Sequence, residues 1–241
     1  MTTAMQLAQA SIARVCDDRV IYESLIDLDG KCIVELGCGT AVNTRALATG
    51  GRERTVIAFE IDAIQHARNM AAARPPNLEF RYGGAEAIAC PAAGVDVVFM
   101  FKSLHHVPGP ALQDALAEIH RVLRPGGYLY VSEPIFAGAF NDILQLFHHE
   151  QRVRQAAFDA LCRVVDAGLF ELAAEEFFLA PANYRDFADF EQRVIKVTHT
   201  AHCLTPAVMA AVRKRFADHC GADGARFAAP MRVDLLRKPQ R

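Results

Sequence analysis

The sequence has no excess of basic side chains and no basic stripe. Its 26 Lys and Arg residues are offset by 28 Asp and Glu residues, which leaves a formal net charge of -2. A protein that binds the phosphate backbone over many nucleotides usually concentrates positive charge on one face or along one helix. The charge balance therefore argues against nucleic acid as a partner.

Long apolar segments are also missing, and the opening residues do not predict a secretory leader. No apolar run reaches membrane-spanning length without a charged residue. The opening residues, MTTAMQLAQASIARVCDD, do not place a basic stretch before a long apolar block, as a signal peptide does. The seven cysteines are odd in number and contain no C-x-x-C pair, which favours free thiols in a reducing compartment. The sequence thus predicts a soluble cytoplasmic protein that does not bind a membrane.

No low-complexity tract, linker or internal repeat divides the chain. Hydrophobic residues make up 52% of its 241 positions, so there is ample material for a buried core. The length suits one large domain better than two full ones. We therefore expect a single domain over 1–241, with an N-terminal helical cap at 1–30, a core at 31–134 and a further set of helices and closing strands at 135–241.

Short β-rich runs alternate with helical patterns in the first part of the chain. The predicted strands cover 32–36, 55–60, 78–82, 95–101 and 128–133, and the predicted helices cover 40–48, 62–74 and 110–123. Apolar strands that alternate with helices indicate a parallel sheet covered on both faces. We expect an α/β fold: a doubly wound, mainly parallel Rossmann-like sheet with an added helical cover and antiparallel closing strands.

The later part of the chain supplies that cover and those closing strands. Its pattern predicts one long or broken helix at 139–167, in which Glu150 and Arg154 form an i,i+4 pair. A strand at 170–179, helical segments near 185–198 and 205–219, and a final strand near 225–238 follow.

A glycine-rich turn follows the first predicted strand, in IVELGCGT (33–40). A dinucleotide site at this place requires G-x-G-x-x-G, because the pyrophosphate approaches the amides at the helix N-terminus. Gly37 and Gly39 are present, but Val42 takes the third position, and Glu35 directs a negative charge into the turn. These features disfavour NAD or FAD and favour a cofactor that carries positive charge and no phosphate.

The stretch VELGCGTAVNT resembles the first motif of the class I S-adenosylmethionine-dependent methyltransferases. GVDVVFMFKSLHHV (94–107) resembles the fourth-strand motif of that family, and LAEIHRVLRPGGYLYVSEP (116–134) resembles its fifth-strand motif. Glu60 ends the second strand, where this family and dinucleotide-binding proteins alike place an acid on the ribose hydroxyls. The resemblance covers 31–134 and is greatest to the small-molecule branch, which includes the ubiquinone and menaquinone biosynthesis methyltransferases.

The resemblance implies S-adenosylmethionine as cofactor and S-adenosylhomocysteine as product. The carboxylate that ends the first strand would organise the cofactor's ammonium, and Ile61 would lie against the adenine. The whole expected cofactor set is Glu35, Gly37, Cys38, Gly39, Glu60, Ile61, Gly84, Ala85 and Phe101.

Two positions depart from the family pattern. Ala41 stands where the family usually has glycine, and its methyl group should crowd the turn slightly but be tolerated if the backbone dihedrals there are ordinary. Gly84 stands where the family typically has an acid that reaches the adenine amino group. We expect the backbone amide of Ala85 to bind the adenine in its place, with Glu86 as the alternative.

Candidate residues for the chemistry lie at the ends of the fourth and fifth strands. Methyl transfer from a sulfonium depends mainly on proximity, alignment and exclusion of water. His105 is the candidate general base of the H-H pair, and Glu133 either faces the substrate or binds a nearby backbone amide. The expected acceptor-binding residues are His148, His149, Tyr184 and His199. The H-x-x-H-C spacing of His199, His202 and Cys203 matches no common zinc pattern, so no metal is expected.

These observations together predict an enzyme that transfers a methyl group from S-adenosylmethionine to a small-molecule acceptor, at oxygen or nitrogen, by in-line displacement. The FKSL loop after the fourth strand differs from the N-P-P-Y or D-P-P-Y loops of enzymes that methylate DNA bases or glutamine side chains. Two alternatives stay open: a non-catalytic S-adenosylmethionine-binding regulatory or partner subunit, and, less favoured, a nicotinamide-dependent oxidoreductase. A monomer and a homodimer both fit the sequence.

Overall fold

The computed structural model describes residues 5–198, 200, 202 and 204–240. Its strands are β1 (Cys32–Leu36), β2 (Thr55–Glu60), β3 (Leu78–Tyr82), β4 (Val95–Phe101), β5 (Leu123–Pro134), β6 (Glu171–Tyr184), β7 (Cys220–Gly221) and β8 (Gly224–Arg237). They form one sheet in the order β3-β2-β1-β4-β5-β8-β6, and the short β7 pairs with β8. Pairing is parallel from β3 to β5, whereas β8 is antiparallel to β5, β6 and β7. This confirms the predicted fold class.

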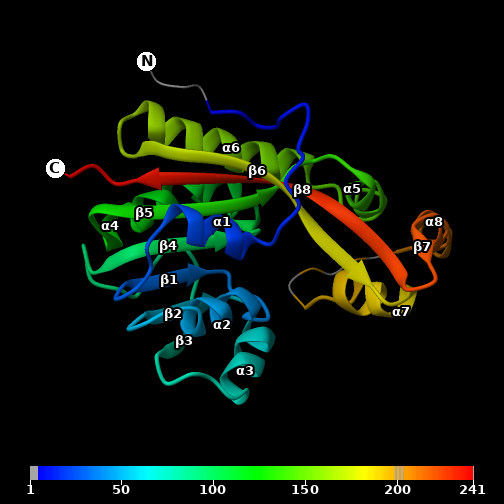
Figure 1. Ribbon diagram of the computed structural model, residues 1–241, viewed down its shortest axis with the longest axis horizontal. Helices are drawn as coiled ribbons and strands as arrows, with labels where there is room; N and C mark the ends of the chain where they lie inside the picture. The colour runs from blue at the N-terminus through cyan, green and yellow to red at the C-terminus, as the bar shows by residue number, and fades with distance from the viewer. Residues whose placement is uncertain (1–4, 199, 201, 203, 241) are drawn as a thin grey trace.

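The helices lie on both faces of this sheet (Figure 1). They are α1 (Asp18–Leu25), α2 (Val42–Thr49), α3 (Ala63–Ala71), α4 (Leu112–Val122), α5 (Ala139–Leu144), α6 (Gln151–Asp166), α7 (Phe187–Phe190) and α8 (Pro206–Ala217). None of the described helices combines the length and the apolar character that crossing a bilayer requires.

Four of the five predicted core strands, β1 to β4, have the bounds that the sequence indicates. The other elements differ where pairing partners decide their length. The strand expected at 170–179 continues to Tyr184, because β8 offers partners as far as Ala225. The segment expected as one long or broken helix at 139–167 is broken into α5 and α6.

Each sheet face buries its own apolar cluster. One cluster lies under α4 and α6, and the other lies under α1 and α2. A third cluster forms where β6 and β8 extend past the other strands toward α5, α7 and α8 (Figure 1). Its largest fully buried side chains are Phe190 and Phe216. The later part of the chain thus has a core of its own beside the sheet.

Candidate active site

The glycine turn between β1 and α2 uses backbone conformations that residues with a side chain rarely adopt. Gly37 and Gly39 have φ angles of 71° and 52°. A Cβ added at Gly37 would lie 2.8 Å from the Ser103 Cβ, whereas one added at Gly39 would meet nothing within 4 Å. The turn therefore passes tightly against the end of β4 and is open at Gly39.

Ala41 shares this left-handed conformation, with a φ of 60°. The condition of ordinary dihedrals, under which the methyl group of Ala41 should be tolerated, is therefore not met. The chain reverses from β1 into α2 within a few residues, and that reversal needs three left-handed residues in five. Ala41 pays about 1–2 kcal/mol for it, while its methyl group is fully buried.

Glu35 lies at the end of β1 with only 2% of its surface exposed. Its Oε2 accepts a hydrogen bond of 2.6 Å from Thr44 Oγ1, at the start of α2. Burial, together with the nearby Glu60 charge, outweighs this hydrogen bond and raises the pKa of the Glu35 carboxyl to about 8. At neutral pH the carboxyl is mainly protonated, and a cation brought beside it would favour the ionised form.

Glu60 connects the end of β2 to the glycine turn. Its Oε2 accepts from the Gly39 amide at 2.6 Å, and its Oε1 accepts from the Asp62 amide at 2.9 Å. Asn69 on α3 donates from Nδ2 to the Gly39 carbonyl at 2.8 Å, a contact that sequence spacing does not reveal. Beside this carboxylate, Ile61 presents an apolar side chain that is 60% exposed.

The remaining predicted cofactor residues surround this turn less directly. Cys38 and Ala85 are buried, and Phe101 packs its ring among Tyr22, Phe99 and Tyr130. Because that ring is committed to the core, Phe101 can border a ligand only through its main chain. The Glu86 carboxylate lies where a Gly84 side chain would stand, which gives the Glu86 alternative a structural basis.

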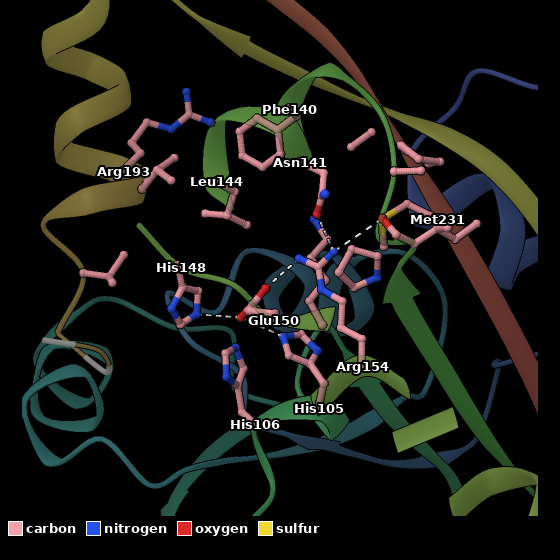
Figure 2. A pocket seen from close by; sticks show the side chains of 18 of the residues that line it. His105, His106, Phe140, Asn141, Leu144, His148, Glu150, Arg154, Arg193 and Met231 are labelled. Atoms are coloured by element: carbon pink, nitrogen blue, oxygen red, sulfur yellow. Dashed lines mark hydrogen bonds and ion pairs between the residues drawn. The ribbon is translucent and has the colours of Figure 1, made fainter. Parts of the chain in front are cut away.

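A cavity of about 290 Å³ lies beside the ends of β4 and β5. One wall is apolar and includes Phe140, Leu144 and Met231, whereas the opposite wall includes His105, His106, His148 and Glu150 (Figure 2). Ile135 contributes a further apolar side chain to the lining. Lys102 and Arg193 also line it. The cavity suits a compound with an apolar body and one polar end.

His105 stands in the polar wall between two carboxylates. Its Nδ1 pairs with Glu133, and its Nε2 lies 3.4 Å from Glu150 Oε1. Burial lowers the pKa of the imidazole, but the two carboxylates outweigh it and raise the pKa of His105 to about 9. Glu133 also accepts from the Leu104 amide at 2.9 Å. Glu133 therefore positions His105 from behind and does not line the cavity.

Glu150 is the functional candidate that sequence reasoning missed. The predicted ion pair with Arg154 is present, with 2.6 Å between Arg154 Nη2 and Glu150 Oε2, but both side chains are buried at the cavity. Glu150 Oε1 lies 2.7 Å from His148 Nε2. Arg154 also donates to Asn141 Oδ1 at 3.1 Å, which ties α6 to α5. The signal was the i,i+4 pair directly after two histidines.

Residues 33–127 match the family model of a methyltransferase domain. This segment contains the glycine turn, Glu60, and the end of β4 that borders the cavity. Residues 33–127 form a class I S-adenosylmethionine-dependent methyltransferase domain.

Individual relatives of the methyltransferase domain agree. A probable S-adenosylmethionine-dependent methyltransferase of Mycolicibacterium smegmatis is 32% identical over 116 residues, which are 48% of this chain and 43% of that protein. A ubiquinone biosynthesis O-methyltransferase of Coxiella burnetii is 29% identical over 110 residues, 46% of each protein. The chain thus spans less than half of the length of these two curated relatives.

A solved structure extends the likeness in fold beyond the matched segment. The YcgJ protein from Bacillus subtilis has a TM-score of 0.61 and 13% identity, over 92% of this chain and 98% of that one. At this identity the likeness concerns the fold alone.

The residues around the turn fit S-adenosylmethionine, the cofactor of this family. Gly39 leaves open space at the turn, Glu60 presents a carboxylate suited to ribose hydroxyls, and Ile61 exposes an apolar surface suited to adenine. The buried Glu35 carboxyl offers a pyrophosphate no complementary charge, whereas the ammonium of S-adenosylmethionine would favour its ionised form. The fit therefore favours the sulfonium cofactor over a dinucleotide.

The acceptor-binding candidates are placed differently from one another. His148 and Tyr184 line the cavity, and the guanidinium of Arg193 lies 4.7 Å from the Tyr184 ring centroid. His149 is exposed and packs against Phe136, so it is not among the residues that line the cavity. His199 lies outside the described residues.

Proposed function

We propose that this chain transfers a methyl group from S-adenosylmethionine to a small-molecule acceptor, at oxygen or nitrogen. One observation carries the proposal: the segment after β4 contributes to both sites. Ser103 packs against Gly37 and donates from Oγ to the Leu36 carbonyl at 2.7 Å. Its neighbours Lys102, His105 and His106 line the cavity. Donor and acceptor would therefore meet across one short loop, as in-line displacement requires.

When bound, S-adenosylmethionine supplies an electrophilic methyl group, so the chain has mainly to bind, align and exclude water. We propose that Glu35 binds the ammonium end of the cofactor and that Glu60 binds its ribose. The apolar side chains of Ile135, Phe140 and Leu144 would enclose the body of the acceptor and keep water from the reacting atoms.

His105 and Glu133 would fix the polar wall against which the acceptor's heteroatom lies. With Glu133 on one ring nitrogen and Glu150 beside the other, the protonated ring can donate a hydrogen bond. It offers no lone pair to accept a proton at neutral pH. The general-base role predicted for His105 thus requires that this proton be displaced first.

Calorimetric titration of the purified protein with S-adenosylhomocysteine, with NAD as the control ligand, tests the donor site. We expect micromolar binding of the first and none of the second. Binding of NAD alone would favour the oxidoreductase alternative. Binding of S-adenosylhomocysteine without methyl transfer to any tested oxygen or nitrogen acceptor would favour the non-catalytic alternative.

A further inference from the structure

We propose that His105, His106, His148 and Glu150 bind a divalent transition-metal ion of the Zn²⁺ type. The four side chains point toward one another on the polar wall of the cavity (Figure 2). The potential ligand atoms of His105, His106 and Glu150 all lie within 4.8 Å of one another. His148 adds a fourth, with its Nε2 2.7 Å from Glu150 Oε1.

The distances between the proposed ligand atoms suit the short bonds of a Zn²⁺-type ion. Two ligands that each lie about 2.1 Å from an ion in a tetrahedral shell are about 3.4 Å apart. His105 Nε2 and Glu150 Oε1 are separated by 3.4 Å. Small movements of the two less buried histidines, His106 and His148, would complete the shell.

Neighbouring side chains orient these ligands from behind. Glu133 binds His105 at Nδ1 and leaves Nε2 directed at the cavity, where a bound ion would displace the proton from Nε2. A carboxylate on the far nitrogen is the usual support of a metal-bound histidine, because it fixes the ring and its tautomer. Arg154 binds Glu150 through Oε2, which leaves Oε1 directed at the histidines. Both supports are buried, so the ligand atoms of His105 and Glu150 are held before any ion arrives.

The donor set selects the kind of ion. Three imidazole nitrogens and one carboxylate oxygen suit Zn²⁺ and similar ions, whereas Mg²⁺ and Ca²⁺ prefer oxygen ligands throughout. The prediction that no metal is bound considered histidines that are close in sequence. This group joins the loop after β4 to the segment before α6, so only the fold brings it together.

With four protein ligands in place, the hydroxyl oxygen of an acceptor would bind the cation as a fifth ligand, and the cation would lower the pKa of that hydroxyl. The acceptor class would then be a compound with an apolar body and a metal-binding hydroxyl or carbonyl oxygen. This last step rests on the proposed function, whereas metal binding itself does not.

The test is a calorimetric titration of tag-free, chelator-treated protein with Zn²⁺, in the absence of donor and acceptor. Co²⁺ titration followed by visible absorption reports the coordination geometry. We expect one equivalent to bind the wild type, and roughly tenfold or greater loss of affinity in His106→Ala and in His148→Ala. His106 is exposed and His148 half-buried, so both variants should fold. His149→Ala, exposed and directly adjacent, is the matched control and should bind as the wild type does.

Absence of Zn²⁺ binding in the wild type would overturn the proposal. The proposal would also fail if His106→Ala and His148→Ala bound Zn²⁺ as tightly as the wild type. It would fail equally if His149→Ala lost as much affinity as those two variants. S-adenosylhomocysteine binding measured on the same samples keeps the two proposals separate. A protein that binds Zn²⁺ but not S-adenosylhomocysteine would support the metal site and contradict the proposed function.

Discussion

The glycine turn proposed to bind the methyl donor (the donor turn) and the cavity proposed to bind the acceptor are built from different kinds of groups. At the donor turn, main-chain amides of Gly37, Cys38 and Gly39 bind the Phe59 carbonyl and the Glu60 carboxylate, all within the sheet edge. The cavity is lined mainly by side chains from segments that are distant in sequence. A backbone turn joined to a parallel sheet can adopt few other conformations. A cavity lined by side chains can change by one substitution at a time. The donor region should therefore be intolerant of small changes at the turn, and the acceptor region should tolerate them locally.

The largest expected effect comes from the third apolar cluster, and the loss of stability should be confined to the elements around it. Phe216 on α8 is fully buried in the third cluster, so Phe216→Ala should cost about 3–5 kcal/mol of stability. We expect faster amide hydrogen exchange in α7 and α8, measured by mass spectrometry, with β1 to β5 and S-adenosylhomocysteine affinity unchanged. Lys214→Ala, exposed on the same helix, is the control. Equal loss of protection in β1 to β5 would show that the two regions are not separable.

At the donor turn a single added methyl group should weaken the binding of S-adenosylhomocysteine strongly. Gly37→Ala introduces a Cβ that would lie 2.8 Å from Ser103, at a φ of 71°. The combined strain and clash, about 3 kcal/mol or more, correspond to a loss of S-adenosylhomocysteine affinity of roughly 100-fold. Gly168→Ala has a similar φ of 70° but no atom within 4 Å, so its affinity should match the wild type. Calorimetry within threefold of the wild type for Gly37→Ala would contradict this account.

Donor affinity should also depend on pH through Glu35. Its pKa of about 8 lies above the ordinary value, so the free protein carries a proton that a bound ammonium would displace. Affinity for S-adenosylhomocysteine should rise by up to about tenfold per pH unit from pH 6 and level off above pH 8. The same raised pKa means that the contribution of Glu35 to stability falls as pH rises toward 8.

Glu35→Gln removes the titrating group and serves as the comparison. Its affinity, measured by calorimetry across the same pH range, should be weak and nearly independent of pH. A slope equal to that of the wild type would assign the pH dependence to another group.

The smallest effect should come from Ala41. Ala41→Gly relieves about 1–2 kcal/mol of backbone strain but loses about 0.8 kcal/mol of methyl burial and adds freedom to the unfolded chain. These terms nearly cancel, so the net change should stay below about 1 kcal/mol, and the Tm should move by less than about 4 °C. Ala41→Val, a β-branched residue at positive φ, should be clearly destabilised. Thermal melting of both variants checks the pair.

The difference between a backbone turn and a cavity lined by side chains also explains how much of each region the sequence predicts. β1 to β4 could be bounded because each is a short apolar run that ends at turn residues. β5 begins earlier than predicted, at Leu123, because its first residue pairs with Val95 and local pattern cannot show that partner. The donor residues lie at fixed spacings after strands, so the sequence places them without knowledge of the fold.

The cavity residues could not be found in this way. Glu150 and Arg154 have the spacing of a surface helix pair, and only the packing of α6 against the loop after β4 buries them. His148 and His149 are neighbours in an irregular segment between α5 and α6. The segment has no helical or strand periodicity that would predict which of the two side chains faces the cavity. In the structure it is His148.

The extension of β6 and β8 past the rest of the sheet has an evolutionary consequence. The segment that matches the family model ends at residue 127, before α5, β6, α7 and β8 begin. The extension carries its own aromatic core, so insertions, deletions and exchanges there need not disturb the glycine turn after β1. A lineage that keeps the glycine turn could therefore change part of the cavity lining, such as Phe140, Tyr184 and Arg193, by diversifying this extension.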